Sequence, residues 1–138
     1  MFEEAIRAGI YSALSSSDAV MNLIKQIYDH VPQPDDPGGG AEFPYISIGD
    51  NTFNQWDTDT EIGAEVTVTI HTWSRYKGRK EVSEIHDAIY SALHRRDEVN
   101  ITGFRLIGCD FEHAEIFVDA DGETRHGVQR YRMIVDSI

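Results

Sequence analysis

The clearest structural signal in the sequence is the stretch 62–74, which reads IGAEVTVTIHTWS. Apolar residues occupy every second position from Ile62 to Ile70, Glu65, Thr67 and Thr69 lie between them, and His71 continues the polar face. An alternation with a period of two is typical of a β-strand that buries one of its faces. We therefore predict a central strand here, whose apolar face, including Val66 and Val68, packs against a helix.

Two segments have the spacing of amphipathic helices. Apolar residues recur three or four positions apart over 3–15 and again over 79–95. In the second segment acidic residues come early and basic residues come late, which complements the helix dipole. A further short helix is predicted after Ser17, because serine is a favourable N-cap.

The remaining apolar runs are short and bounded by turn residues. They predict strands at 27–31, 43–48, 104–111, 114–118 and 128–135. The Pro- and Gly-rich segment 32–42 and the polar segment 49–61 are expected to be connections, and the Asp-Gly pair within 119–122 predicts a hairpin turn. Because strands and helices are segregated along the chain, we predict an α+β fold: a largely antiparallel sheet packed against one long helix, with a short N-terminal helical segment.

Length and charge exclude several classes of protein. A chain of 138 residues fits one domain, 1–138. It has 12 Lys and Arg residues against 24 Asp and Glu residues, so its formal charge of −12 argues against a nucleic-acid packaging protein. Its single cysteine, Cys109, excludes an intrachain disulfide framework. No apolar run approaches the roughly 20 residues of a membrane span, and the acidic N-terminus is unlike a secretory signal.

The residues that could support catalysis or metal binding do not form a recognised pattern. His86 and His94 share a predicted helix but are too far apart for the i, i+4 zinc pair. The sequence from Asp119 resembles the start of a calcium loop, yet Gly122 stands where a ligand is needed. The glycines at 38–40 do not lie between a strand and a helix, as a phosphate loop requires. We therefore expect no catalytic residue, no metal and no cofactor.

Two other features are candidates for contacts with a partner. Phe53 and Trp56 lie in the polar connection 49–61, where large aromatic side chains either fold back onto the core or dock onto a partner. The run RYKGRK at 75–80 is basic in an acidic chain. Such a run is either a solvated turn or a contact with an acidic neighbour.

Several motifs, taken in order, carry a resemblance to a known family. They are FPYISIG at 43–49, VTVTIHTWSR at 66–75, a helix that ends in ALH at 92–94, and VQRYRM at 128–133. Together they resemble the tail-completion, or tail-terminator, family of long-tailed bacteriophages, prophages and gene transfer agents. The resemblance covers nearly the whole chain, and its specificity lies in the ordered set.

The resemblance implies a structural α+β subunit, not an enzyme. Six copies would form a ring on the head-proximal end of the tail tube, stop tube polymerisation and dock to the head–neck connector. The implied partners are further copies, the tail tube protein and the connector protein, and DNA would pass through the pore without specific binding. The protein would reside in the virion tail, and in the bacterial cytoplasm during assembly, with no membrane involved. Alternatives are another neck component, such as a head-closure or adaptor protein, or a small host ligand-binding domain or enzyme.

A closed ring requires a heterologous contact between two different patches of the subunit. The basic run at 75–80 and the acidic stretch at 50–61 are the expected patches. The candidate residues for a subunit or tail-tube interface are Phe53, Trp56, Asp57, Asp59, Arg75, Tyr76, Lys77, Arg79 and Lys80.

Overall fold

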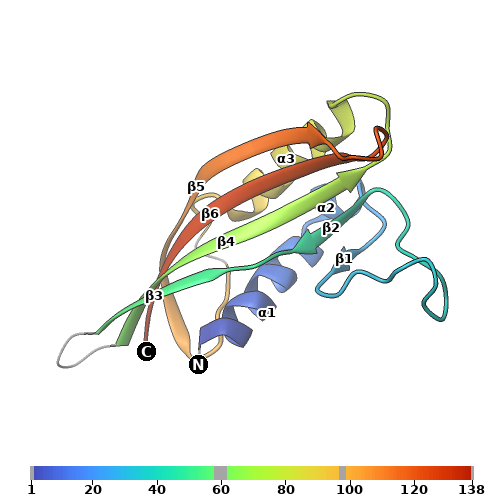
Figure 1. Cartoon of the computed structure of the whole chain (residues 1–138). Coiled ribbons are helices and arrows are strands. Elements are labelled where there is room, and N and C mark those ends of the chain that lie inside the picture. Colours follow the sequence, from blue (N-terminus) through green and yellow to red (C-terminus); the bar gives the residue numbers. More distant parts are fainter. Residues whose placement is uncertain (1, 58–61, 97–98, 138) are drawn as a thin grey trace.

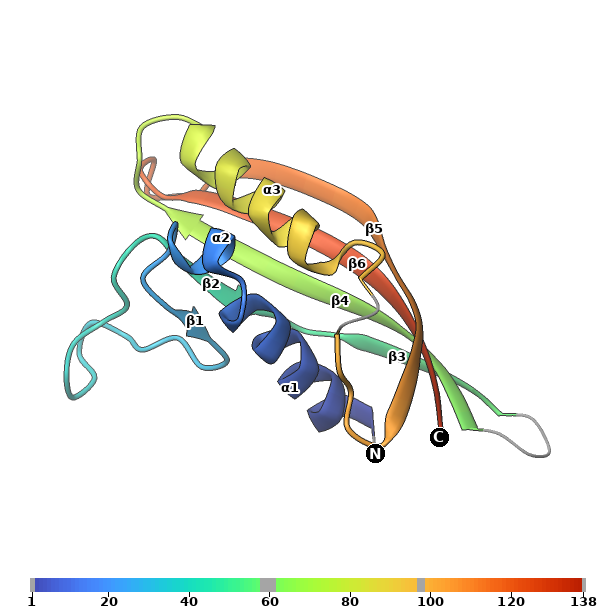
Figure 2. The same ribbon diagram turned by 180° about the vertical axis from the view of Figure 1, so that it is seen from behind.

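The computed structural model describes residues 2–57, 62–96 and 99–137, which form a six-stranded sheet with helices on one face (Figures 1 and 2). The helices are α1 (Phe2–Ser15), α2 (Asp18–Met21) and α3 (Lys80–Leu93). The strands are β1 (Ile27–Tyr28), β2 (Tyr45–Ile48), β3 (Thr52–Asp57), β4 (Ile62–Ser74), β5 (Phe104–Val118) and β6 (Arg125–Ser137). The strand order is β1-β2-β4-β6-β5, with β3 also paired to β4, and only the β1–β2 pair is parallel. The predicted α+β class with a mostly antiparallel sheet is confirmed.

Strand β4 is the centre of the sheet, as its alternating sequence predicts. It pairs with β6 along one side and with both β2 and β3 along the other. Val66, Val68 and Ile70 are fully buried on the face that packs against α3, whereas Thr67 and Thr69 are half-buried on the opposite face. The apolar period of two therefore sets which face of the sheet becomes the core.

The two main helices, α1 and α3, cover this inner face together (Figure 2). Each has 14 residues, so the N-terminal helical segment is not short and α3 is not the one long helix of the prediction. The helix α1 buries Ile6, Ile10 and Leu14, whose spacing of four places them in one stripe. Between the helices, α2 begins after the predicted cap Ser17, whose Oγ accepts a hydrogen bond from the Val20 amide at 3.3 Å.

Two strand predictions were wrong, although the number of strands is the same. The polar segment 49–61 contains β3, which lies antiparallel to the first half of β4; its sequence, TFNQWD, lacks the apolar alternation of a strand with a buried face. The predicted strands 104–111 and 114–118 are one strand, β5. Register shifts between Leu106 and Gly108, and between Phe111 and His113, interrupt the alternation of β5.

The predicted connections at 32–42 and 119–122 are confirmed, because neither contains a helix or a strand. In the β5–β6 turn, the Gly122 amide donates to the Asp119 carbonyl at 2.9 Å, and Gly122 has a φ of 72°. Such a positive φ favours glycine, which has no Cβ. Among the described residues, no helix is long and apolar enough to cross a membrane.

Candidate assembly interface

The basic segment, residues 75–80, is the loop that joins β4 to α3, and part of it is fixed to the subunit's own surface. The Arg75 guanidinium lies over the Phe43 ring, with its Cζ 4.2 Å from the ring centroid, and Arg75 Nε donates to Thr124 Oγ1 at 3.4 Å. Lys80 Nζ lies 3.8 Å from Glu84 Oε1, in an exposed pair that contributes little to stability. These two cations therefore have partners within the chain.

The middle of the basic segment is free for contacts outside the subunit. Tyr76 is 50% exposed, and Lys77 and Arg79 are also exposed. Neither of these cations forms an ion pair within residues 2–57, 62–96 and 99–137. Arg79 is the N-cap residue of α3, but its side chain makes no capping hydrogen bond. An exposed aromatic ring between unpaired cations is a favourable composition for a binding surface.

Three of the remaining predicted interface residues, Phe53, Trp56 and Asp57, belong to β3, away from the basic segment. Phe53 pairs with Val66 and packs half-buried against the core, which is the first of the two alternatives for this residue. Trp56 and Asp57 belong to β3, but their side chains lie outside the described part of the chain, as does all of Asp59. Val66 and Ser74 are eight residues apart along β4, or roughly 26 Å. Within one subunit the basic segment and the described part of the acidic stretch therefore lie apart, and their contact across a subunit interface stays a prediction.

An aromatic cluster that the sequence analysis did not identify lies on the outer face of the sheet, opposite the helices. The Trp73 and His126 rings stack with centroids 3.8 Å apart, and Phe117 contacts His126 edge-on at 4.6 Å. Trp73 Nε1 donates to Ser47 Oγ at 3.0 Å. The missed signal was the polar face of β4, where His71 and Trp73 continue the alternation on the side away from the core.

Two histidines of this cluster form a hydrogen-bonded pair. His71 Nδ1 lies 2.7 Å from His126 Nε2, so one nitrogen donates and the other accepts. Burial lowers the pKa of both imidazoles from the usual value, and the neighbouring His71 lowers the pKa of His126 further. The carboxylates of Asp50 near His71 and Asp119 near His126 oppose these shifts. The pair is therefore neutral at pH 7 and extends the aromatic surface rather than adding charge.

Strand β5 is the outermost strand on one side of the sheet, and its centre is covered by the turn after α3. The Arg95 amide donates to the Cys109 carbonyl at 2.7 Å, and the Phe111 amide donates to His94 Nδ1 at 3.0 Å. Arg95 Nε also contacts Asp110 Oδ1 at 3.2 Å. Beyond these contacts, no part of the described chain pairs with the outer edge of residues 112–118. This section of the edge is open.

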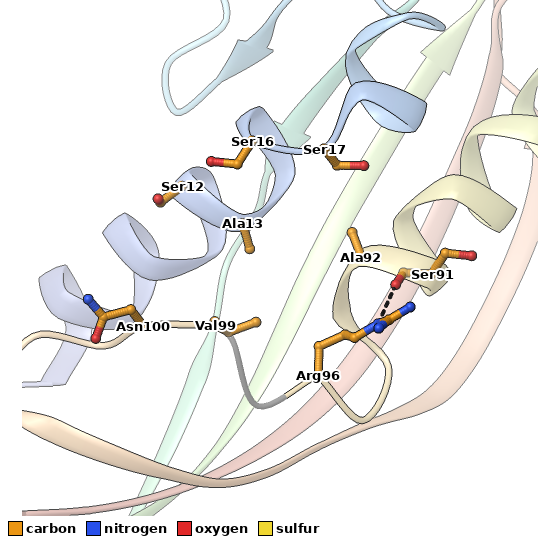
Figure 3. A pocket seen from close by; sticks show the side chains of 9 residues that line it. All are labelled: Ser12, Ala13, Ser16, Ser17, Ser91, Ala92, Arg96, Val99 and Asn100. Atoms are coloured by element: carbon orange, nitrogen blue, oxygen red, sulfur yellow. Dashed lines mark hydrogen bonds between the residues drawn. The ribbon is translucent and has the colours of Figure 1, made fainter.

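A groove of about 440 Å³ lies between the ends of α1 and α3 (Figure 3). Small side chains line most of it, including Ser12 and Ser16 from α1 and Ala92 from α3. Arg96 crosses one side and donates from Nε to the Ser91 carbonyl at 2.9 Å. The described residues that line the groove include no histidine or carboxylate.

The residues weighed for metal binding or nucleophilic chemistry do not converge on a site. In the described ranges, no three His, Cys, Asp or Glu side chains are arranged to hold a metal ion. Cys109 is 2% exposed, and burial raises the pKa of its thiol to about 12. A thiol with this pKa stays protonated at neutral pH and is not an active nucleophile.

Comparison with known proteins gives a consistent result. The family described as tail completion protein gp17 matches residues 8–136. The tail completion protein gp17 of Bacillus phage SPP1 is 26% identical over 133 residues, covering 96% of this chain and 93% of that protein. Its solved structure has a TM-score of 0.61 and covers 98% of this chain and 89% of its own. A chain in the virion of a native gene transfer agent particle has a TM-score of 0.87 at 22% identity, covering 99% of this chain and 98% of that chain.

Proposed function

Because the chain belongs to the tail completion protein gp17 family, we propose that six copies form a ring on the head-proximal end of a tail tube. The ring stops polymerisation of the tube and docks to the head–neck connector. The family is one of structural proteins, so the chain is a tail component and not an enzyme. Residues 1–138 act as one domain, which is present in the virion and, during assembly, in the bacterial cytoplasm.

The family match over residues 8–136 is the observation that carries this proposal, and the shape of the sheet supports the ring. The two sides of the sheet are unlike: β5, with 15 residues, forms one side, whereas β1 and the outer edge of β3 form the other. A contact between unlike sides is heterologous, and such a contact closes into a ring when its rotation divides a full turn, here into six. Subunits that associate in this way need no symmetric patch.

The charge of the chain fits a pore through which DNA must pass. Each copy carries a formal charge of −12, so a ring is strongly negative. Cations on the pore wall would hold phosphates and slow the passage of the duplex, whereas an acidic wall repels it. We therefore place the basic segment at a subunit or tube contact and not on the inner wall. A ring structure in which Arg75, Lys77, Arg79 and Lys80 point into the channel would contradict this placement.

The test measures the mass of the purified protein in solution, alone and with tail tube protein. The expected result is a complex of six copies on the tube end, visible by electron microscopy as a cap at one end of isolated tubes. Tubes grown with the protein should be shorter than tubes grown without it. Binding to emptied heads, with no binding to tubes, would instead identify a head-closure or adaptor protein.

A further inference from the structure

A groove of about 260 Å³ lies between α3 and β5, on the face of the sheet that the helices cover (Figure 2). Tyr90 of α3 and Phe111 of β5 form its aromatic walls, with ring centroids 5.7 Å apart in an edge-to-face contact. Ala114 of β5 also lines the groove, is exposed, and has only a methyl group as its side chain. The groove is therefore open to a side chain that enters from solvent.

Gln129 is the least exposed residue of the lining, at 2%, and one of its polar atoms has no partner. Its Nε2 donates to the His86 carbonyl at 3.2 Å and to the Tyr131 hydroxyl at 3.1 Å. A carbonyl oxygen can only accept, so the amide nitrogen must face His86, and Oε1 is the atom left over. Oε1 has no acceptor contact with any donor of the described residues. Because a buried carbonyl oxygen normally accepts a hydrogen bond, the groove is suited to a ligand with an N–H or O–H donor.

The charge of the groove favours a cationic donor. Of the described residues that line it, Asp87 alone carries a charge at pH 7, and it forms no ion pair within the described ranges. The lining histidine, His86, is neutral at this pH, because burial lowers its pKa to about 4. The rings of Tyr90 and Phe111 also attract cations. A neutral donor would satisfy Gln129, whereas a cation would complement Asp87 as well.

Among cationic side chains, lysine fits this groove better than arginine. A guanidinium presents five N–H donors in a planar fork, whereas the groove offers one unpartnered carbonyl and one carboxylate. The other unpartnered atom nearby, His86 Nε2, lies against the backbone of Gly127, where a Cβ would collide with it. An ammonium is compact, and its apolar stem can lie along aromatic walls.

The chain's own lysines are poor candidates for this ligand. Lys25, Lys77 and Lys80 are its only three. Lys80 already faces Glu84, and Lys77 belongs to the loop that leads into the same helix, α3, that forms one wall of the groove. A lysine from a different protein is therefore the better match.

We propose that the groove between α3 and β5 binds the side chain of a lysine from a different protein of the assembled tail. The stem of this lysine lies against Tyr90 and Phe111. Its ammonium donates to Gln129 Oε1 and faces the carboxylate of Asp87. The identity of the partner as a tail protein rests on the proposed function, whereas the chemistry of the groove does not.

Titration with Nα-acetyl-lysine methylamide, followed by NMR of the full-length chain, tests this chemistry without requiring a ring. The probe should shift the Ala114 amide signal and the Gln129 side-chain amide signals. Nα,Nε-diacetyl-lysine methylamide, which has no charge, should bind at least tenfold more weakly. Asp87→Asn should weaken binding of the charged probe at least threefold, whereas Glu84→Gln, which removes an exposed carboxylate of α3 outside the groove, should not change it. Equal binding of the two probes, or no shift of these signals, would overturn the inference.

Two variants locate the bound probe in the groove. Gln129→Met removes the acceptor at nearly the same side-chain length and should weaken binding at least tenfold. Because this change also removes two native hydrogen bonds, Ala114→Leu gives an independent check: it fills the groove from an exposed position, leaves Gln129 in place and should weaken binding to the same degree. If either variant is folded by circular dichroism and binds the probe as wild type does, the ammonium is not bound here.

Carbodiimide coupling in assembled tails identifies the source of the ammonium, because it joins a carboxylate to an amine in close contact. Mass spectrometry should find Asp87 joined to a lysine of another tail protein, in a product that is absent from isolated subunits and from Asp87→Asn tails. Asp87 that stays unlinked, or that is linked to a lysine of this chain or of a second copy, would overturn the assignment of the partner even where the free probe binds. Wild-type protein that caps no tubes would refute the proposed function instead, and the probe titration would still decide the chemistry of the groove.

Discussion

A single carboxylate placed at Val68 should remove most of the stability of the fold. Val68 is fully buried in β4 and lies opposite Tyr131, so an aspartate there has neither water nor a cation as partner. Losing the burial of valine costs about 1.5–3 kcal/mol. If burial raises the pKa of the aspartate by about 3 units, the ionised state costs about 4 kcal/mol more at pH 7. The sum, about 6 kcal/mol, is comparable with the whole stability of many domains, about 5–15 kcal/mol.

The matched control is Thr67→Asp, one residue earlier in the same strand. Thr67 is half-buried on the outer face and lies opposite Arg132, so a carboxylate there remains solvated next to a cation. Urea unfolding should be followed by far-UV circular dichroism and tryptophan fluorescence at pH 7. We expect Thr67→Asp to unfold close to the wild-type midpoint and Val68→Asp to be unfolded, or nearly so, without urea.

The pH dependence gives a second check on the same reasoning. In Val68→Asp, the folded-state pKa of the introduced carboxyl is raised above its unfolded value of about 3.9, so the deficit is largest at high pH and shrinks as the pH falls. The part of the stability loss that comes from ionisation of the carboxyl group should decrease from about 4 kcal/mol at pH 7 to about 1.5 kcal/mol at pH 5, relative to wild type at each pH. Equal midpoints for Val68→Asp and Thr67→Asp at pH 7 would refute the assignment of Val68 to the core.

Three further outcomes follow from the described side chains. Burial lowers the pKa of His86 to about 4. Between pH 7 and pH 4 the imidazole therefore becomes protonated in the unfolded chain while it stays largely neutral in the folded chain, and the free energy of unfolding should fall by about 3 kcal/mol. His86→Gln should flatten this profile, and a slope as steep as that of wild type would contradict the assignment. Asp121→Ala should lower the melting temperature at pH 7, because Asp121 accepts hydrogen bonds from the Glu123 and Thr124 amides and from the Thr124 hydroxyl. These bonds lower the pKa of Asp121 to about 2, so the difference from wild type should be present above about pH 4 and disappear as the pH falls toward 2. Chelator should leave the melting curve unchanged; a loss of stability that zinc or calcium restores would reveal a metal site.

The sequence predicted those elements whose side chains alternate without interruption. In β4 every second residue from Ala64 to Ile70 is buried, and this strand was located almost to the residue. In β5 the two bulges shift the alternation, so the segments before and after His113 look like separate strands. In β3 the pairing with the first half of β4, which follows directly in the sequence, forms the strand, and its residues TFNQWD lack the apolar alternation that would have marked it.

The candidate interface was predictable only in part, for a related reason. The charge of Lys77 and Arg79 and their position in a loop follow from the sequence, and both side chains are exposed. The groove beside Gln129 depends on the packing of α3 against β5, which brings residues more than 30 positions apart into one wall. The hydrogen bonds from Arg95 to Cys109 and from Phe111 to His94, which cover the centre of the β5 edge, depend on where α3 ends. Contacts of this kind are set by tertiary structure, so a linear pattern cannot show them.

The length of β4 has a mechanical consequence. At roughly 3.3 Å per residue, its 13 residues span roughly 43 Å, and it is hydrogen-bonded to β6 from Gly63 to Ser74. The hydrogen bonds of an antiparallel pair run perpendicular to the strands, so a force along β4 loads them together in shear. A force across the sheet would instead separate them one after another, as in a zip. The subunit should therefore resist tension along its strands far better than tension across them.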